Sequence, residues 1–230
     1  MKTTPIIAAL VASLSSSYGQ TTFSQTQNFG PSVLSFQEAL NFNQFTGNLS
    51  DIVSITWCYS LTVNGGQMVI DNDSDQAASV NAMFGGELDI TSSLTLLDPS
   101  FNPVFDDVSA FTSGIFNLAP NQGDVVGDYD PNGPDGDTLV GQVNTSTGDG
   151  DVNQAFWNQY VGSGQLTLDV SADSLLDVGS VGGVEFASTP ADAFGSITLK
   201  IVTAAPAVPE PSSALLSMAG LLAFGLRRRR

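Results

Sequence analysis

The run from Asp51 to Val63 constrains the fold of this chain more than any other stretch. It is rich in β-branched and aromatic residues, and from Ile55 onward its odd-numbered positions are mostly apolar. A period of two residues is typical of a strand with one buried face and one solvated face. No long stretch between residues 20 and 206 repeats apolar residues at helical spacing. We therefore predict that this region is all-β.

Short strand signals recur along the region, separated by clusters of glycine, asparagine, aspartate and proline. The further candidate strands are Val33–Leu40, Gln67–Asp71, Ser79–Phe84, Leu88–Leu97, Ile115–Leu118, Thr138–Val143, Gln165–Val170 and Gly195–Val202. Asn64-Gly65 predicts a tight hairpin turn before Gln67–Asp71, and Asp173–Asp177 predicts one short helical turn. Many short strands punctuated in this way favour an antiparallel β-sandwich of jelly-roll or Ig-like type.

Charge is segregated along the chain. Of the six Lys and Arg residues, only Lys200 lies between residues 20 and 206, where it stands against 22 carboxylates for a net charge of −21. Such a domain is repelled by nucleic acid and by anionic lipid headgroups, so nucleic acid is excluded as a partner. The other basic residues lie in two flanking segments that have the character of targeting signals.

Residues 1–19 are predicted to be a secretory signal peptide. Lys2 precedes a short apolar run, Ile6–Leu14, and small residues such as Ser17 and Gly19 follow it. A charged, an apolar and a small-residue region in this order direct export, with cleavage expected before Gln20. A buried N-terminal helix is the alternative. The region 20–206 is then expected to leave the cytoplasm through the secretion machinery.

Residues 207–230 have three parts in a fixed order. Pro209, Glu210 and Pro211 come first, the apolar stretch 212–226 follows, and the last residues are Arg227, Arg228, Arg229 and Arg230. The apolar stretch predicts a short C-terminal helix, below the roughly 20 residues of a stable membrane span, and the arginines are expected to stay cytoplasmic. This order resembles the PEP-CTERM sorting signal of Gram-negative bacteria. The resemblance implies transient membrane anchoring and removal of the tail by an exosortase; a plain membrane anchor is the alternative.

The region 20–206 resembles the choice-of-anchor E domain of exported bacterial proteins. Four pieces carry the resemblance, in the order Leu40–Leu49, Val69–Ser74, Asp128–Gly133 and Gln159–Gly164. That family is defined by its sequence and by its varied C-terminal anchors. The resemblance therefore implies an anchored surface protein, and it implies neither an activity nor a ligand.

Composition excludes several kinds of catalytic and metal site. The chain has no histidine, which excludes Ser-His-Asp triads, Cys-His dyads and His-ligated metals. Cys58 is the single cysteine, so no disulfide forms within the chain, and its apolar neighbours predict a buried small side chain. Two correctly spaced carboxylates would suffice for a glycoside hydrolase. No pair stands out in the sequence, and we predict that the chain is not an enzyme.

Calcium is the one cofactor that the sequence suggests, because Ca²⁺ prefers closely spaced oxygen ligands. The candidate ligands are Asp128, Asp130, Asn132, Asp135 and Asp137. Gly133 occupies the sixth place of an EF-hand-type loop, but the twelfth place is Leu139 instead of the bidentate glutamate. A second run, Asp71–Asp75, also has carboxylates at alternate positions. The alternative, which is favoured for both runs, is that these residues form turns and solubilise the surface.

Together these features predict a structural or adhesive protein of the cell envelope, outer surface or extracellular matrix of a Gram-negative-type bacterium. An exosortase-type enzyme and the secretion machinery are the expected partners, and extracellular polysaccharide is a further candidate. A carbohydrate- or calcium-binding module is the first alternative, and a glycoside hydrolase is the second. A carbohydrate-binding module would expose an aromatic stripe, such as Trp157 and Tyr160, whereas an enzyme would show a cleft with converging carboxylates.

Overall fold

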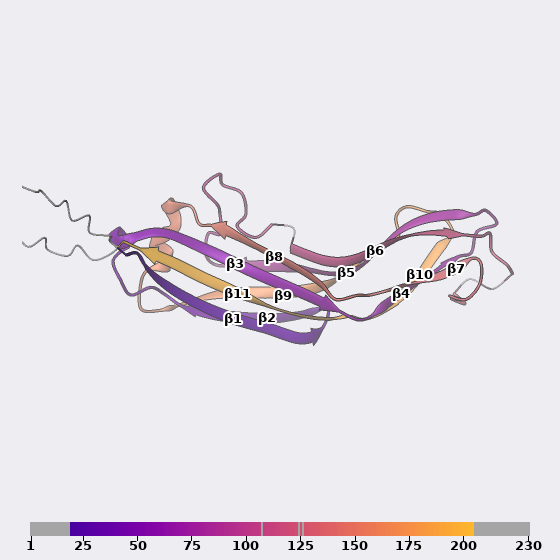
Figure 1. Cartoon of the computed structure of the whole chain (residues 1–230), viewed down its shortest axis with the longest axis horizontal. Coiled ribbons are helices and arrows are strands. Elements are labelled where there is room, and N and C mark those ends of the chain that lie inside the picture. Colours follow the sequence, from indigo (N-terminus) through magenta and orange to yellow (C-terminus); the bar gives the residue numbers. More distant parts are fainter. Residues whose placement is uncertain (1–18, 107, 124, 126, 205–230) are drawn as a thin grey trace, which may run out of the picture. The chain divides into compact units, whose positions relative to one another are not determined.

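A computed structural model of the chain describes residues 19–204 except 107, 124 and 126 (Figure 1). The strands are β1 (Thr21–Val33), β2 (Phe36–Asn43), β3 (Ile52–Asn64), β4 (Gln67–Asn72), β5 (Ala78–Ser92), β6 (Val108–Leu118), β7 (Gly136–Val140), β8 (Asn144–Asp151), β9 (Gln165–Asp177), β10 (Val184–Thr189) and β11 (Asp192–Thr203). Two short 3-10 helices are η1 (Leu49–Asp51) and η2 (Gln154–Tyr160). Apart from Gly19, the predicted signal peptide lies outside the described residues, as does the predicted C-terminal helix.

The strands pair into antiparallel sheets within one compact unit, Thr22–Thr203. One four-stranded sheet has the order β1-β11-β3-β8, the other has the order β2-β9-β5-β6, and a three-stranded sheet has the order β10-β4-β7. The predicted all-β antiparallel sandwich is confirmed. Over the part of the chain that the structure describes, no helix is long and apolar enough to cross a membrane.

The three-stranded sheet continues one of the four-stranded sheets around a bend. β3 runs on into β4, β10 into β11 and β7 into β8, so the order β11-β3-β8 is repeated as β10-β4-β7 (Figure 1). At the bend the N–H of Gly141 donates to the carbonyl of Gly66 at 3.0 Å. The hairpin predicted at Asn64-Gly65 is therefore wrong. β4 pairs with β10 and β7 and not with β3, because the glycines bend the chain forward without reversing it.

β9 continues through the segment predicted to be a helical turn. Asp173–Asp177 pairs with β5 from Glu87 to Met83. β5 itself joins two predicted strands across Gly85 and Gly86 into one strand of 15 residues. A long partner strand offers a hydrogen-bonded ladder at every position, so pairing prevails over the local preference of Asp173–Asp177.

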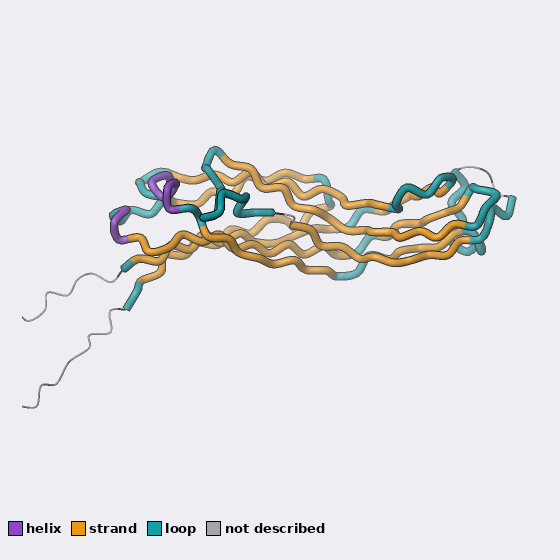
Figure 2. The backbone as a smooth tube through the Cα atoms, turned by 90° about the horizontal axis from the view of Figure 1, so that it is seen from above, coloured by secondary structure: helices purple, strands orange, loops and turns teal. Residues whose placement is uncertain are grey.

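The chain enters and leaves the sandwich at the same end (Figure 2). Thr203, the last residue of β11, pairs with Ile52, the first residue of β3. At the opposite end β4 stops at Asn72, which pairs with Val184 of β10. The loops that follow β4 and β6 lie at this opposite end, so the acidic segments of the sequence are remote from Thr203.

The core is built on the odd-numbered residues of β3, as predicted. Ile55, Trp57 and Leu61 are completely buried. The Trp57 ring lies edge-on to Phe42 with 4.9 Å between ring centroids, and its Nε1 donates to the Tyr160 hydroxyl at 3.0 Å. Burying a side chain the size of Phe42 contributes roughly 1.5–3 kcal/mol. Apolar burial thus dominates the stability of a domain with a single lysine.

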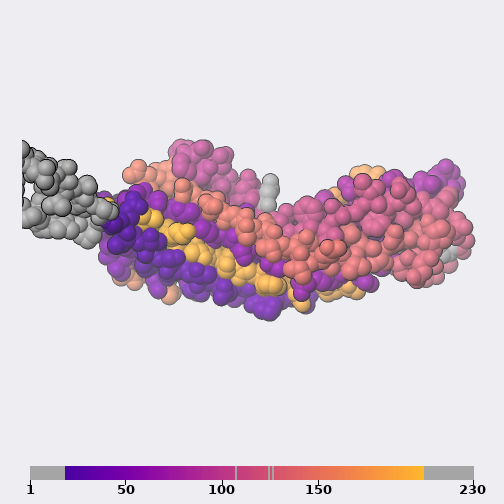
Figure 3. Space-filling view, in the orientation of Figure 1, coloured from indigo at the N-terminus to yellow at the C-terminus, as the bar shows by residue number. Residues whose placement is uncertain are grey.

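From Ser54 onward, the even-numbered residues of β3 form the outer face of the β1-β11-β3-β8 sheet. Figure 3 shows β11 in yellow between β1 and β3 on this face. Small polar residues of neighbouring strands bond across it, for example Thr62 to Thr145 at 2.9 Å. Cys58 lies on the same face, between Thr198 and Asp149, and is half-buried. The prediction that Cys58 is a buried small side chain is therefore wrong, because the alternation of β3 turns it outward.

Candidate functional site

The two acidic runs that the sequence suggested as metal ligands lie next to one another. Asp71 of β4 pairs with Gly136 of β7, and the N–H of Asn72 donates to the carbonyl of Asp135 at 3.0 Å. Asp71, Asn72 and Asp135 are all at most 2% exposed. The register of β4 against β7 thus combines segments that are far apart in the sequence into one acidic end of the sandwich.

The predicted calcium ligands differ in burial and in hydrogen bonding. Asp135 is buried, and the exposed ones are Asp128, Asp130, Asn132 and Asp137. Asp130 Oδ1 accepts from the N–H of Asn132 at 2.9 Å, and Asp137 Oδ1 accepts from the N–H of Thr138 at 2.6 Å. Asp135 Oδ2 accepts from the N–H of Gln122 at 2.5 Å. Carboxylates that accept from nearby backbone N–H groups are typical of turn-forming aspartates.

Asp130 and Asp135 are the predicted ligands that the structure brings together. They converge over Gly133, where a methyl group would stand 2.6 Å from Asp135 Oδ1 and 3.5 Å from Asp130 Oδ2. Within residues 19–204, leaving aside the three undescribed positions, no group of three or more Cys, Asp or Glu side chains could hold a metal ion. The calcium site stays a prediction.

Asp73 carries an incompletely satisfied carboxylate at the acidic end. Its Oδ2 is enclosed and has no hydrogen-bond partner among the described residues. Its Oδ1 accepts only a long bond from Asn121 Nδ2, at 3.4 Å, while its own N–H donates to the carbonyl of Gly183 at 2.8 Å. An enclosed carboxylate oxygen without a donor costs free energy. Sequence reasoning could not single out Asp73, because the groups that enclose it come from distant loops.

Trp157 and Tyr160 do not form an exposed aromatic stripe. Tyr160 is completely buried, and burial raises the pKa of its hydroxyl to about 12 although the hydrogen bond from Trp57 acts in the opposite direction. Trp157 lies one turn earlier in η2 and is half-buried. The short helix turns the two rings to different environments, which the sequence alone did not reveal.

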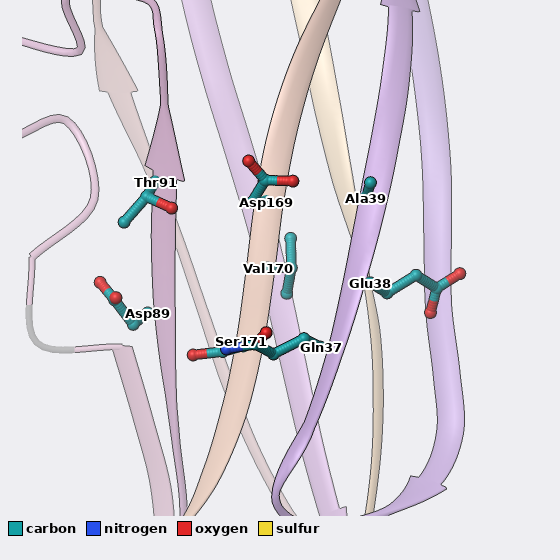
Figure 4. Close-up of a pocket in the computed structure, with 8 residues that line it drawn as sticks. All are labelled: Gln37, Glu38, Ala39, Asp89, Thr91, Asp169, Val170 and Ser171. Carbon is teal, nitrogen blue, oxygen red and sulfur yellow. The ribbon is translucent and has the colours of Figure 1, made fainter.

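A hollow of about 470 Å³ lies on the outer face of the β2-β9-β5 strands (Figure 4). Asp89 and Asp169 both line it, on diagonal positions, because Asp89 pairs with Ser171 and Asp169 pairs with Thr91. Both aspartates are exposed to water. A glycoside hydrolase needs one carboxyl kept protonated by apolar surroundings. In this hollow the two aspartates face water, so the hollow offers hydrogen-bonding groups but no apolar enclosure around either carboxyl.

A comparison with curated proteins found no match. Among solved structures, the T13 particle of infectious bursal disease virus has a TM-score of 0.20 and 11% identity, over 87% of this chain and 40% of the viral chain. The Gt strain of the same virus has a TM-score of 0.12 and 13% identity, over 88% and 48%. Its VP2 subviral particle has a TM-score of 0.11 and 9% identity, over 97% and 54%. The chain thus spans about half the length of these chains, and TM-scores this low carry no argument about fold or function.

The C-terminal segment matches a family of sorting signals. The PEP-CTERM protein-sorting motif matches residues 207–230, which are the boundaries predicted from the sequence. The matched segment includes Pro209, Glu210, Pro211 and Arg227–Arg230, all outside the described residues. The choice-of-anchor E resemblance of the sandwich stays a prediction. The chain carries a PEP-CTERM sorting motif, which marks it as an exported, cell-envelope-associated surface protein that an exosortase processes.

Proposed function

We propose that this chain is a non-catalytic structural or adhesive protein, presented on the outer surface or in the extracellular matrix of a Gram-negative-type bacterium. The observation that carries the proposal is the arrangement of the sandwich ends. Thr203, which leads to the sorting motif, lies at one end, and the acidic loops lie at the other. Attachment through the sorting motif therefore leaves the loops as the part of the sandwich farthest from the point of attachment.

Deleting Arg227–Arg230 is expected to abolish both processing and retention of the protein, because the positive cluster holds the tail on the cytoplasmic side. In the producing bacterium, mass spectrometry of the mature wild-type protein should find a C-terminus that lacks Arg230. Cells that carry the deletion should lose surface-accessible protein and attach as poorly as cells without the gene.

The matched control replaces the same four arginines by lysines. This keeps the positive charge that holds the tail on the cytoplasmic side. Mature wild-type protein that retains Arg230 would contradict exosortase processing and leave a plain anchor. Normal attachment by cells without the gene would contradict the adhesive role.

Calcium binding at the acidic end is the second candidate function. It is favoured by the convergence of Asp130 and Asp135 over Gly133 and by the enclosed, unpartnered Oδ2 of Asp73. A domain with a charge of −21 is also stabilised by general screening, which depends on ionic strength alone. The two effects are separable because only a bound ion acts at constant ionic strength.

Calcium at a hundredfold excess over its Kd is expected to stabilise the folded protein by about 2.7 kcal/mol, which raises the Tm by several degrees. Thermal melts of the exported protein at fixed high NaCl, with calcium or with EDTA, measure this shift. The shift should disappear in the Asp128→Ala, Asp130→Ala double variant and persist in Asp89→Ala, which changes an aspartate on another face. Equal melts in calcium and EDTA would leave screening as the only effect.

A further inference from the structure

A cleft of about 320 Å³ lies where the start of β3, the end of β8 and η2 meet, at the end of the sandwich that holds Thr203. Its apolar lining includes Val53, Pro99 and Trp157, and its polar lining includes Ser54, Asp151 and Gln154. None of these residues belongs to the acidic end or to the hollow of Figure 4. The cleft is thus a separate candidate site, and its lining includes a tryptophan.

The Trp157 ring is held in a fixed orientation. Its Nε1 donates to the carbonyl of Val152 at 2.9 Å, and Val152 is itself 2% exposed. Because the indole N–H is already satisfied within the protein, the ring presents its carbon surface to the cleft instead of a hydrogen-bond donor. The tryptophan therefore offers an apolar platform.

The opposite side of the cleft is tied to the same helix. Asn153 caps η2 by accepting from the N–H of Ala155 at 3.0 Å, and its Nδ2 donates to the carbonyl of Asp98 at 3.2 Å. Its N–H also donates to the carbonyl of Leu97 at 2.8 Å. These bonds fix the loop that carries Pro99 against η2. A preformed cleft loses little conformational entropy when a ligand binds.

Three polar groups in the cleft keep capacity for a ligand. Asp151 Oδ1 accepts from the Thr56 hydroxyl at 2.6 Å, which leaves Oδ2 for another donor. Within the described part of the chain, the side chains of Ser54 and Gln154 make no hydrogen bond, and Gln154 is exposed. Together they provide a carboxylate acceptor, a hydroxyl and an amide next to an aromatic ring.

We propose that this cleft binds a neutral hexose unit of a polysaccharide. A sugar ring combines an apolar C–H face, which packs on an indole, with hydroxyl groups that donate to a carboxylate and bond to an amide. The cleft volume is at the lower end of the range for small-molecule sites, which suits one or two sugar rings. Asp151 and the domain charge of −21 repel uronic acids, phosphates and sulfates. This inference rests on the proposed adhesive function and gives it a ligand at the end of the sandwich that holds Thr203, not at the acidic loops.

The test is titration calorimetry of the exported mature protein with neutral hexose oligomers (cellohexaose, laminarihexaose and maltohexaose) and with acidic polygalacturonate, in EDTA. At least one neutral oligomer should bind and polygalacturonate should not. Gln154→Ala should weaken binding about fivefold, the loss of one hydrogen bond. Trp157→Phe should weaken binding at least about tenfold, because the platform shrinks.

The matched control is Gln37→Ala, which removes an exposed glutamine from the hollow of Figure 4 and should leave binding unchanged. Circular dichroism melts establish that each variant is folded. The inference is overturned if no neutral oligomer binds, or if binding is the same in Gln154→Ala and Trp157→Phe as in wild type. If either of these results is found and cells without the gene still fail to attach, the hexose ligand is wrong and the adhesive function stands.

Discussion

Replacing Gly66 by alanine is expected to destabilise the sandwich by about 3 kcal/mol, as the sum of backbone strain and overpacking at the bend. Gly66 has a φ of +72°, which an L-residue adopts only with strain. An added methyl group would stand 2.6 Å from Phe84 Cζ, 2.9 Å from the carbonyl oxygen of Thr189 and 3.0 Å from the nitrogen of Ala191. Two of these neighbours are backbone atoms of the strand connection β10–β11, so they cannot move aside cheaply. Urea unfolding of the exported protein measures the loss.

The neighbouring glycine provides a matched control. Gly65 has a φ of +77°, and a methyl group added there would meet nothing within 4 Å. Gly65→Ala should therefore cost only about 1 kcal/mol, the contribution of backbone conformation alone. The difference between the two variants isolates the crowding at the bend. Equal losses in both variants would mean that the three segments at the bend, which join β3 to β4, β10 to β11 and β7 to β8, do not pack closely there.

Stability is expected to fall steeply between pH 10 and pH 12, and Tyr160 is the reason. Burial raises the pKa of its hydroxyl from 10.0 to about 12 in the folded protein. Between these values the unfolded state has released the proton and the folded state retains it, so folding weakens as the pH rises. The stabilising contribution is complete below pH 10. About 3 kcal/mol is lost in all once the pH exceeds 12, since each of the two pKa units corresponds to about 1.4 kcal/mol.

Tyr160→Phe separates this effect from general alkaline unfolding. The variant loses the bond from Trp57 Nε1, so it should be about 1 kcal/mol less stable than wild type near pH 8. Between pH 10 and pH 12 its stability should decline much less, so the two curves should approach and then cross. Tyr59→Phe, a change at a partly buried tyrosine, serves as the control. If the stabilities of wild type and Tyr160→Phe fall in parallel between pH 10 and pH 12, the buried hydroxyl is not the cause of the loss.

Strands with an alternating apolar pattern could be predicted from the sequence, and strands without one could not. The odd-numbered residues of β3 gave its buried face correctly, and β4 was predicted to within one residue. β11 was predicted as Gly195–Val202, although it begins at Asp192. β8 has the sequence Asn144–Asp151, with no large apolar residue, and is a strand because it pairs with β3 from Thr56 to Val63. Such a strand is specified by its partner and not by its own composition.

The bend after β3 and the acidic end could not be predicted from the sequence for a different reason. Asn64-Gly65 is a strong local signal for a hairpin, but a local signal does not specify whether the next strand returns or continues. That choice depends on β10 and β7, which flank β4 on both sides. In the same way, Asp71 and Asp135 were each recognised in the sequence, and only the register of β4 with β7 makes them neighbours. The Trp157 cleft likewise joins elements from three distant parts of the chain.

β11 leads directly to the sorting motif, so any tension on an anchored protein enters the sandwich at Thr203. This strand of 12 residues lies between β1 and β3 and is hydrogen-bonded on both sides. Antiparallel hydrogen bonds run across the strand direction, so a pull along β11 against a load held at the opposite end of the sandwich stresses them in shear, all at once, instead of opening them one after another. A cell held in place through this protein would thus pull on a strand whose detachment requires many bonds to break together.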